Sequence, residues 1–383
     1  MEHKSPEIYA NFNSEGESRK MRRLLEHKDF TVDLINSELL HEERIKLHSG
    51  GNYIPIDGSE MRKPNSDKIE NLMKVRSLDG KLVNGYRTIN AILIQKNNVQ
   101  LLSTIPYSSN ADDFKSENTI TFDLIDNINK SINKGNYHLT YLFDSKYDDQ
   151  KYFNRIAQEG DFFITRVKHL NRKVTDNKGK SKALIDLTYR KIGTIEYETI
   201  FVTGRRYKNI RASFRYANIT YNEQKLTVIN VELKNGKGNN IFKKPFYIIT
   251  NITYSRFSKK RIIDIYNAYL KRWKIELLFK FLKNNLGWEK FGLKSYKANK
   301  NLIAMTFMVA AYLYQIEEID IDKNIIEYIA YMGRGKGTVS KKYLLQGIHD
   351  IVITSRTIEN LKKNYTEEQI DEIHEFLDLK RRF

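Results

Sequence analysis

The chain has 383 residues, 40% hydrophobic and 12% aromatic, a composition that excludes a disordered protein and suits two or three structural units. It carries 65 Lys and Arg against 47 Asp and Glu, a net charge of +18, which favours a polyanionic partner such as nucleic acid. The absence of cysteine excludes disulfides, thiolate zinc sites and cysteine nucleophiles, and the eight histidines lack metal-ligand spacing.

The beginning of the chain has no apolar stretch of the kind that forms a secretory signal. Helical spacing at residues 18–27 and 32–47, followed by a break at Gly50-Gly51, predicts a helical N-terminal region over residues 1–50. The longest apolar run, residues 302–313, is too short to span a bilayer and is typical of a buried helix. We therefore expect a soluble, intracellular protein.

Strand-like and helix-like segments alternate from residue 51 to residue 170. Periodicity predicts helices at residues 121–132 and 152–160 and strands at residues 53–59, 85–95, 99–107, 138–145 and 161–168. Such alternation predicts an α/β layer architecture.

The pattern changes to β-branched and alternating runs over residues 171–245. Strands are predicted at residues 183–189, 197–205, 213–221 and 225–233. A further strand is predicted at residues 246–252, and then a long helix over residues 258–283 with Ser258 as its N-cap. The region 321–383 is charged and largely helical, and its Gly-rich stretch 333–338 lacks the spacing of a phosphate-binding loop, which indicates a basic turn.

Two acids come where predicted strands end. Asp57 follows one apolar run and Asp144 another. Ligands of α/β sheets gather at the carboxyl ends of strands, and two acids on neighbouring strands could hold Mg²⁺, which prefers hard oxygen ligands. An acid that merely begins a turn is the common alternative for either residue alone.

The long helix carries a third acid on a polar stripe. Tyr269, Arg272, Glu276 and Lys283 lie at offsets of 3, 7 and 14, within an arc of about 60° at roughly 100° per residue. Trp273 and Lys280 share this stripe, while apolar residues occupy most of the remaining circumference. An ordinary salt-bridged face would explain the Arg272–Glu276 pair but not the whole pattern.

These motifs resemble those of the insertion-sequence DDE transposases, in the group whose third acid lies within a Tyr-Arg-Glu-Lys signature. Tyr269, Arg272, Glu276 and Lys283 reproduce that signature at full spacing. Asp57-Gly58-Ser59 is similar to the first motif of the family and Asp144-Ser145-Lys146-Tyr147 to the second. The resemblance covers about residues 53–314.

The resemblance implies an RNase H-like core, a mixed sheet flanked by helices, with helical regions at both ends. Its two parts would be residues 51–170 and 246–320, with the β-rich stretch 171–245 inserted between them, which fits the gap of 132 residues (276 − 144) between the second and third acids. It implies two Mg²⁺ or Mn²⁺ ions held by Asp57, Asp144 and Glu276, and hydrolysis of phosphodiesters followed by strand transfer of a 3′-hydroxyl.

The expected partners are the double-stranded DNA of transposon ends and target, and a second copy of the chain, since joining two ends needs two active sites. Tyr269, Arg272, Lys280 and Lys283 would contact DNA, as would a second basic stretch with Arg205, Arg206, Lys208, Arg211 and Arg215. The resemblance also implies a bacterial cytoplasmic protein associated with the nucleoid.

Relatives that open DNA through a hairpin stack a flipped base on an aromatic residue, often a Trp, of the inserted stretch. This insertion has no Trp, because the only two are Trp273 and Trp288. Tyr207, Phe214 and Tyr216 are the candidates to replace it.

Three hypotheses remain open: an active transposase, a non-catalytic sequence-specific DNA-binding protein derived from one, and a basic RNA-binding protein with an accidental motif match. The presence of all three acids favours the first, because a binding protein has no need of them.

Overall fold

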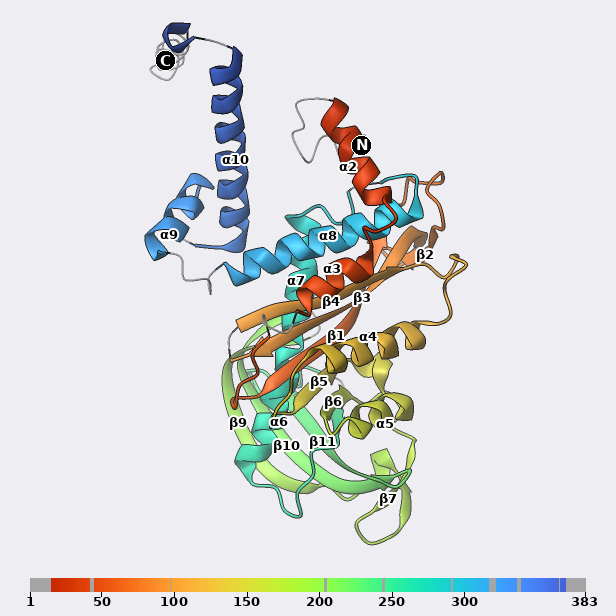
Figure 1. The fold of residues 1–383 in the computed structure, drawn as a ribbon. Coiled ribbons are helices and arrows are strands. Elements are labelled where there is room, and N and C mark those ends of the chain that lie inside the picture. The colour runs from red at the N-terminus through yellow and green to blue at the C-terminus, as the bar shows by residue number, and fades with distance from the viewer. Residues whose placement is uncertain are drawn as a thin grey trace. The chain divides into compact units, whose positions relative to one another are not determined.

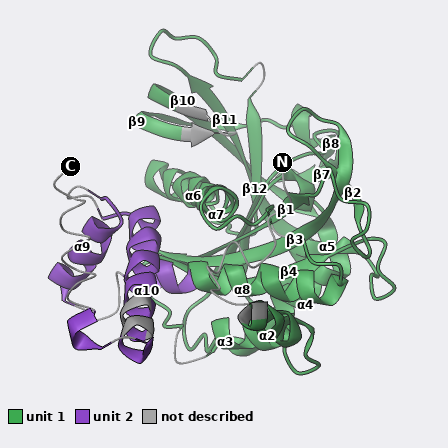
Figure 2. Cartoon of the chain, turned by 90° about the horizontal axis from the view of Figure 1, so that it is seen from above, with its two compact units in different colours: residues 1–310 green, residues 311–383 purple. Residues whose placement is uncertain are grey.

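The computed structural model describes residues 15–41, 45–96, 98–202, 205–242, 245–290, 292–316, 322–335, 339–364 and 366–369. The chain divides into two compact units, Met1–Ala310 and Ala311–Phe383 (Figure 2), and each is described by itself. None of the described helices has both the length and the apolar character that crossing a bilayer requires.

A mixed sheet of twelve strands, counted over the described residues, forms the centre of the first unit. The strands are β1 (Asn52–Arg62), β2 (Met73–Arg76), β3 (Leu82–Gln95), β4 (Asn98–Tyr107), β5 (Leu139–Phe143), β6 (Phe162–Arg166), β7 (Lys173–Asp176), β8 (Ser181–Ala183), β9 (Arg190–Val202), β10 (Arg205–Tyr221), β11 (Gln224–Lys234) and β12 (Phe246–Thr250). Their order is β2-β3-β1-β5-β6-β12-β11-β10-β7-β8, with β4 beside β3 and β9 beside β10. Among these strands, the β1–β5 and β5–β6 pairs are parallel.

Helices cover both faces of this sheet (Figure 1). The described helices of the first unit are α2 (Glu15–Glu26), α3 (Val32–Leu39), α4 (Glu117–Ser131), α5 (Gln150–Gln158), α6 (Lys259–Lys271), α7 (Trp273–Asn284) and most of α8 (Tyr296–Gln315), and those of the second are α9 (Lys323–Met332) and α10 (Lys341–Asn364). Leu124 of α4 and Phe153 of α5 share a core with Tyr141 of β5, whereas Tyr266 of α6 shares another core with Leu142. Tyr141 and Leu142 are successive residues of one strand, so the two cores lie on opposite faces of the sheet.

Most strands and helices predicted between residues 51 and 170 coincide with β1, β3, β4, α4, β5, α5 and β6. The three later predicted strands of the β-rich stretch coincide with parts of β9, β10 and β11. These long antiparallel strands continue the central sheet, because β12 pairs with β11 on one side and with β6 on the other. The mixed α/β class predicted from the sequence is therefore confirmed.

Two predicted elements are wrong in extent or type. The helix predicted over residues 32–47 ends at Leu39, after which the chain turns and buries Ile45 in the core of β1 and β5. The strand predicted over residues 183–189 is instead a short 3-10 turn, Leu184–Asp186. The Leu184 N–H donates to the carbonyl of Arg172 and the Tyr189 hydroxyl donates to the carbonyl of Leu184, so turn contacts replace strand pairing.

The second unit contains α9 and α10. The two helices approach closely at Gly347, where an added Cβ would lie 1.8 Å from the Ile329 carbonyl oxygen. Gly333 ends α9, and a Cβ there would lie 1.9 Å from the Tyr343 carbonyl oxygen. Both positions therefore need glycine for steric reasons. Residues 336–338 of the predicted basic turn lie outside the described residues.

Candidate active site

The first two acids lie on neighbouring parallel strands. Pro55 of β1 is opposite Leu142 of β5, and Asp57 and Asp144 are each two residues further along. Asp144 directly follows the end of β5, as predicted. Asp57 does not end its strand, because β1 continues to Arg62 by pairing with β3, where Asp57 is opposite Asn90. Both acids thus lie at the edge where the parallel part of the sheet ends, which is where α/β sheets bind ligands.

Local hydrogen bonds fix the backbone that carries Asp144. Its carboxylate accepts from the Lys146 N–H at 2.7 Å and caps the 3-10 turn Ser145–Tyr147. The Thr165 hydroxyl of the adjacent strand donates to the Asp144 carbonyl at 2.8 Å. The second acid is therefore anchored both to its own turn and to β6.

Arg272 connects the first and third acids. Its guanidinium lies 3.0 Å from Asp57 Oδ2 through one nitrogen and 2.7 Å from Glu276 Oε1 through the other. The side chains of Arg272 and Asp57 are 13% and 17% exposed, so their ion pair is largely shielded from water, whereas Glu276 is 32% exposed. Two carboxylates that are 219 residues apart in sequence (276 − 57) thereby contact the same guanidinium group.

The helix predicted over residues 258–283 is interrupted at Arg272. Ser258 caps its start, as predicted, by accepting from the Arg261 N–H. α6 ends at Lys271 and α7 begins at Trp273. At the junction the Arg272 N–H donates to the Tyr269 carbonyl and the Ile275 N–H to the Arg272 carbonyl, a tighter spacing than the four-residue bonds of an α-helix. The interruption lies at the residue that joins the two acids.

The carboxylates of this site influence one another electrostatically. Burial raises the pKa of Asp57 to about 7, against the opposing effect of Arg272, and Asp144 and Glu276 raise it further. Burial also raises the pKa of Glu276, which Arg272 opposes and Asp144 again increases. Mutual repulsion of this kind favours a positive charge beside the carboxylates, and in this structure Arg272 supplies it to Asp57 and Glu276.

The donor chemistry of the three acids fits a divalent ion, because Mg²⁺ and Mn²⁺ prefer carboxylate oxygens. The buried Asp57 carboxylate is neutralised by a guanidinium, which is the kind of charge that an ion would otherwise supply. Over the described residues, no three carboxylate or imidazole groups surround one point closely enough to hold an ion. Arg272 thus takes the role of the cation between Asp57 and Glu276 in this structure.

The other residues of the helical signature differ in their surroundings. Lys283 donates to the Glu60 carbonyl at 2.6 Å and lies 3.3 Å from Glu289, and burial lowers its pKa. Tyr269 is partly buried beside Arg272, and its burial raises its pKa. Lys280, by contrast, is exposed on α7. Arg272 and Lys283 together tie α7 to β1 on either side of Glu276.

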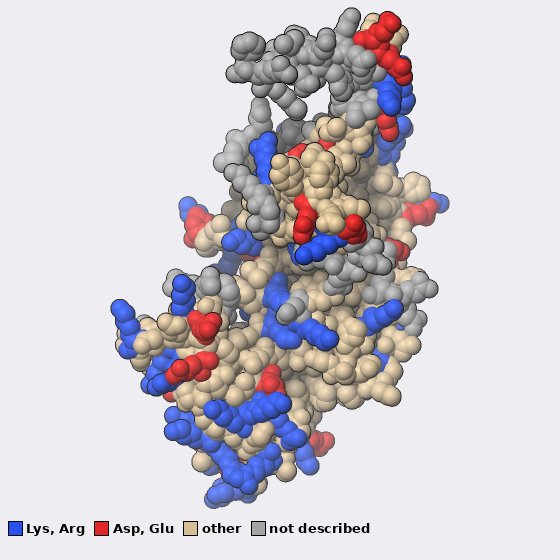
Figure 3. Space-filling view, turned by 90° about the vertical axis from the view of Figure 1, so that its left-hand side faces the viewer, with Lys and Arg blue, Asp and Glu red and all other residues tan. Residues whose placement is uncertain are grey.

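The second basic stretch forms the start of β10. Its exposed cations include Lys208, Arg211 and Arg215, and Arg211 pairs with Glu196 of β9 at 2.9 Å. Nothing is described of the side chains of Arg205 and Arg206. Figure 3 shows Lys and Arg side chains gathered at the end of the first unit where Figure 1 has β9, β10 and β11.

The three aromatic candidates for base stacking are buried to different degrees. The Phe214 ring is fully buried and packs edge-on against Tyr266 at 5.1 Å. Tyr216 is 4% exposed, and its hydroxyl accepts from the Phe257 N–H. Tyr207 is the partly exposed member of the three.

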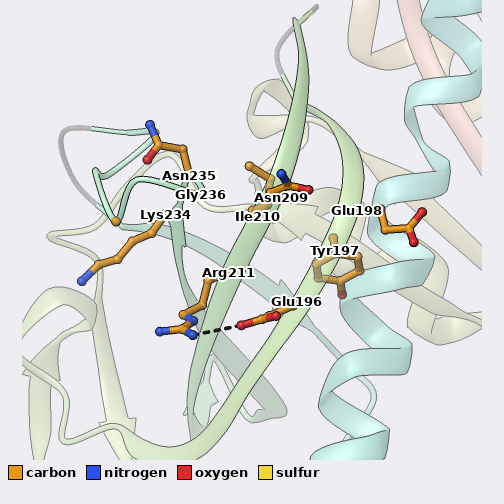
Figure 4. A pocket seen from close by; sticks show the side chains of 10 residues that line it. Glu196, Tyr197, Glu198, Asn209, Ile210, Arg211, Lys234, Asn235 and Gly236 are labelled. Atoms are coloured by element: carbon orange, nitrogen blue, oxygen red, sulfur yellow. Dashed lines mark hydrogen bonds and ion pairs between the residues drawn. The ribbon is translucent and has the colours of Figure 1, made fainter.

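A pocket of about 460 Å³ opens between β9, β10 and the loop that follows β11 (Figure 4). Its polar lining includes Glu196, Glu198, Arg211 and Lys234. The left-handed backbone of Asn209, with φ of 51°, shapes one wall. No motif or periodicity in the sequence predicts this pocket.

A cluster of cations beside the acids was not predicted either. Glu289 Oε1 accepts from the Arg62 N–H at 3.2 Å, and the Lys63 ammonium donates to the Glu289 carbonyl at 3.0 Å. Arg62 and Glu289 are 227 residues apart in sequence, so periodicity and spacing carry no signal of their contact.

The Transposase DDE domain family model matches residues 50–312 of the chain, a stretch that includes Asp57, Asp144 and Glu276. Among solved structures, the chain is similar to that of the piggyBac transposase synaptic complex with hairpin DNA, at 9% identity and a TM-score of 0.46. That match covers 85% of this chain, which spans a little over half (57%) of the other. None of the curated proteins matches the sequence.

Proposed function

Because the chain belongs to the family of transposase DDE domains, we propose that it is an active DNA transposase of an insertion sequence. It cuts transposon ends by hydrolysing phosphodiester bonds and joins the freed 3′-hydroxyl to target DNA. Two observations support this most: Asp57 and Asp144 follow paired residues of the parallel strands β1 and β5, and Arg272 forms ion pairs with both Asp57 and Glu276.

Asp57, Asp144 and Glu276 would together hold two divalent ions, with Asp57 shared between them, Asp144 serving one ion and Glu276 the other. When bound, Mg²⁺ or Mn²⁺ would activate the attacking water and neutralise the departing oxygen. Arg272 occupies Asp57 Oδ2 and Glu276 Oε1, so these two oxygens would become ligands only if Arg272 left them. Arg272 then has two free guanidinium edges, which suit a bidentate contact to a DNA phosphate.

The remaining DNA contacts fall into two groups. Near the acids, Tyr269, Lys280 and Lys283 would contact phosphates that flank the scissile bond. On β10, Arg205, Arg206, Lys208, Arg211 and Arg215 would bind the duplex farther away. If a flipped base is stacked, Tyr207 is the aromatic residue that fits, because a base could reach Phe214 or Tyr216 only after the core opens.

We assign the RNase H-like core to residues 51–170 and 246–320, which carry the three acids, and the inserted β-rich part to residues 171–245. Residues 1–50 and 321–383 would serve recognition of the ends and contact between two copies on DNA. A homodimer on DNA follows from the need for one active site at each transposon end.

Cleavage of DNA from both sides of the gene tests this function. The protein is incubated with duplexes that carry the flanking inverted repeats, with Mg²⁺, with Mn²⁺ or with EDTA, and strand breaks are mapped on sequencing gels. We expect breaks at the repeat ends with either metal and none with EDTA. Binding of the repeats without breaks under any metal condition would instead support the non-catalytic DNA-binding protein.

The basic surface of β10 predicts a change in the salt dependence of DNA binding. Replacing Arg211 and Arg215 together by Gln is expected to weaken binding and to reduce the slope of log K against log salt by about two. The matched control replaces Lys130 and Lys151, exposed on α4 and α5, by Gln. The slopes are measured by fluorescence anisotropy. Equal slopes for the two double variants would show that these arginines of β10 do not contact DNA.

A further inference from the structure

Three cations meet one carboxylate where β1 ends. Glu289, which follows α7, lies 3.3 Å from the Lys283 ammonium and 3.8 Å from the Arg62 guanidinium. The Lys63 ammonium donates to the Glu289 backbone carbonyl, which fastens this segment to β1. The nearby Glu60 carboxylate is already paired with Arg87 at 3.1 Å. The Glu289 carboxylate is therefore the one in ion-pair contact with Arg62 and Lys283, and Glu60 acts on Lys283 less strongly.

The arrangement is unfavourable without an anion at its centre. Burial lowers the pKa of Lys283 most. The nearby Arg62 charge lowers this pKa further, while Glu289 raises it. Burial likewise lowers the pKa of Lys63 to about 8. Like charges this close repel each other, so the cluster needs the negative charge that Glu289 supplies.

The cluster is partly accessible to solvent. The side chains of Arg62, Lys283 and Glu289 are 21%, 18% and 23% exposed, so none of the three is sealed within the core. Lys63 is buried and serves to fix the loop and to add charge. Lys283 also donates to the carbonyl of Glu60, three residues after Asp57 on β1, so the cluster adjoins the acids.

We propose that Arg62 and Lys283 form a phosphodiester-binding site beside the catalytic acids and that Glu289 occupies it as a built-in counter-anion until DNA binds. The proposal rests on the proposed function. A phosphodiester carries one negative charge and two free oxygens, as a carboxylate does, and can therefore contact the same two cations. When a DNA phosphate enters, the Glu289 side chain turns out to solvent while its backbone stays bound to Lys63.

The competition predicts that loss of the Glu289 charge strengthens DNA binding. The test measures anisotropy of short fluorescent duplexes in EDTA, one with the flanking repeat and one scrambled, over a range of salt. We expect Glu289→Gln to bind about threefold to tenfold more tightly than the parent, as the loss of one or two partly exposed competing ion pairs implies. Arg62→Gln should bind more weakly, with a salt slope reduced by about one, and Arg62→Lys should restore most of that slope.

The matched control is Glu159→Gln, which removes the same charge from an acid that lies 4.0 Å from Lys134. If Glu289→Gln binds no better than this control, Glu289 only braces the fold and the proposal is wrong. If Glu289→Gln lowers the thermal unfolding midpoint, the Arg62 variants test the proposal instead. An unchanged salt slope of DNA binding in Arg62→Gln would then show that the proposed site is wrong. Failure of the parent itself to bind either duplex would refute the proposed function, whereas normal parental binding with unaffected variants refutes this site alone.

Discussion

Replacing Asp57 or Asp144 by Asn, or Glu276 by Gln, is expected to lower the rate of DNA cleavage by at least about a thousandfold. Each change keeps the shape of the side chain but removes one negatively charged oxygen donor, and the proposed site has three such donors for two ions. DNA binding should persist, because it depends on cations elsewhere. Single-turnover cleavage and anisotropy on the same preparations measure both quantities.

Asp126→Asn is the matched control for these variants. Asp126 pairs with Arg155 between α4 and α5 and lies outside the proposed site. Its cleavage rate should stay within about twofold of the parent, since one exposed ion pair contributes little. Cleavage by any of the three acid variants at the parental rate would show that the assignment of that acid is mistaken.

Arg172→Ala is expected to destabilise the fold by about 3–5 kcal/mol, because it leaves a buried carboxylate without its cation. Arg172 lies 2.8 Å from Asp148, and the two side chains are 8% and 0% exposed. Asp148 lies four residues after Asp144 in sequence. Its carboxylate also accepts hydrogen bonds from the backbone N–H groups of Lys168 and His169. The pair therefore holds the segment behind the second acid, and urea unfolding of the metal-free protein measures its contribution.

The comparison is Arg155→Ala, which breaks another Arg–Asp pair whose arginine is 40% exposed. That change should cost less than about 1 kcal/mol, because water replaces the lost partner. A similar loss of stability in both variants would mean that burial does not increase the contribution of the Arg172–Asp148 pair to the free energy of unfolding.

The sequence predicted the parts of the fold that depend on local periodicity. The strands that carry Asp57 and Asp144, and the N-cap at Ser258, follow from apolar runs and a capping residue. The interruption at Arg272 did not follow, because the residues around it are ordinary helix formers. The interrupted residue is also the one whose side chain contacts Asp57, on a strand more than 200 residues earlier, and sequence patterns carry no signal of that contact.

The candidate site was likewise predictable only in part. Spacing on one helix placed Arg272 four residues before Glu276, and this pair is formed. The hydrogen bond of Lys283 to the Glu60 carbonyl and its ion pair with Glu289 could not be predicted from the sequence, because both depend on how the end of α7 packs against β1. Contacts between elements distant in sequence are set by packing, which one-dimensional patterns do not encode.

The continuous pairing of the central sheet limits the distance between β1, which carries Asp57, and β10, which carries the second basic stretch. From β1 to β10 the order is β1-β5-β6-β12-β11-β10, five steps of about 4.8 Å, or about 24 Å along the sheet. B-DNA rises about 3.4 Å per base pair, so this span corresponds to at most roughly seven base pairs, because the strands twist relative to one another. Backbone hydrogen bonds join every strand along the way, which limits how far this spacing can change. A duplex held by both β10 and the acids would consequently be held within about seven base pairs of the cut, whatever its sequence.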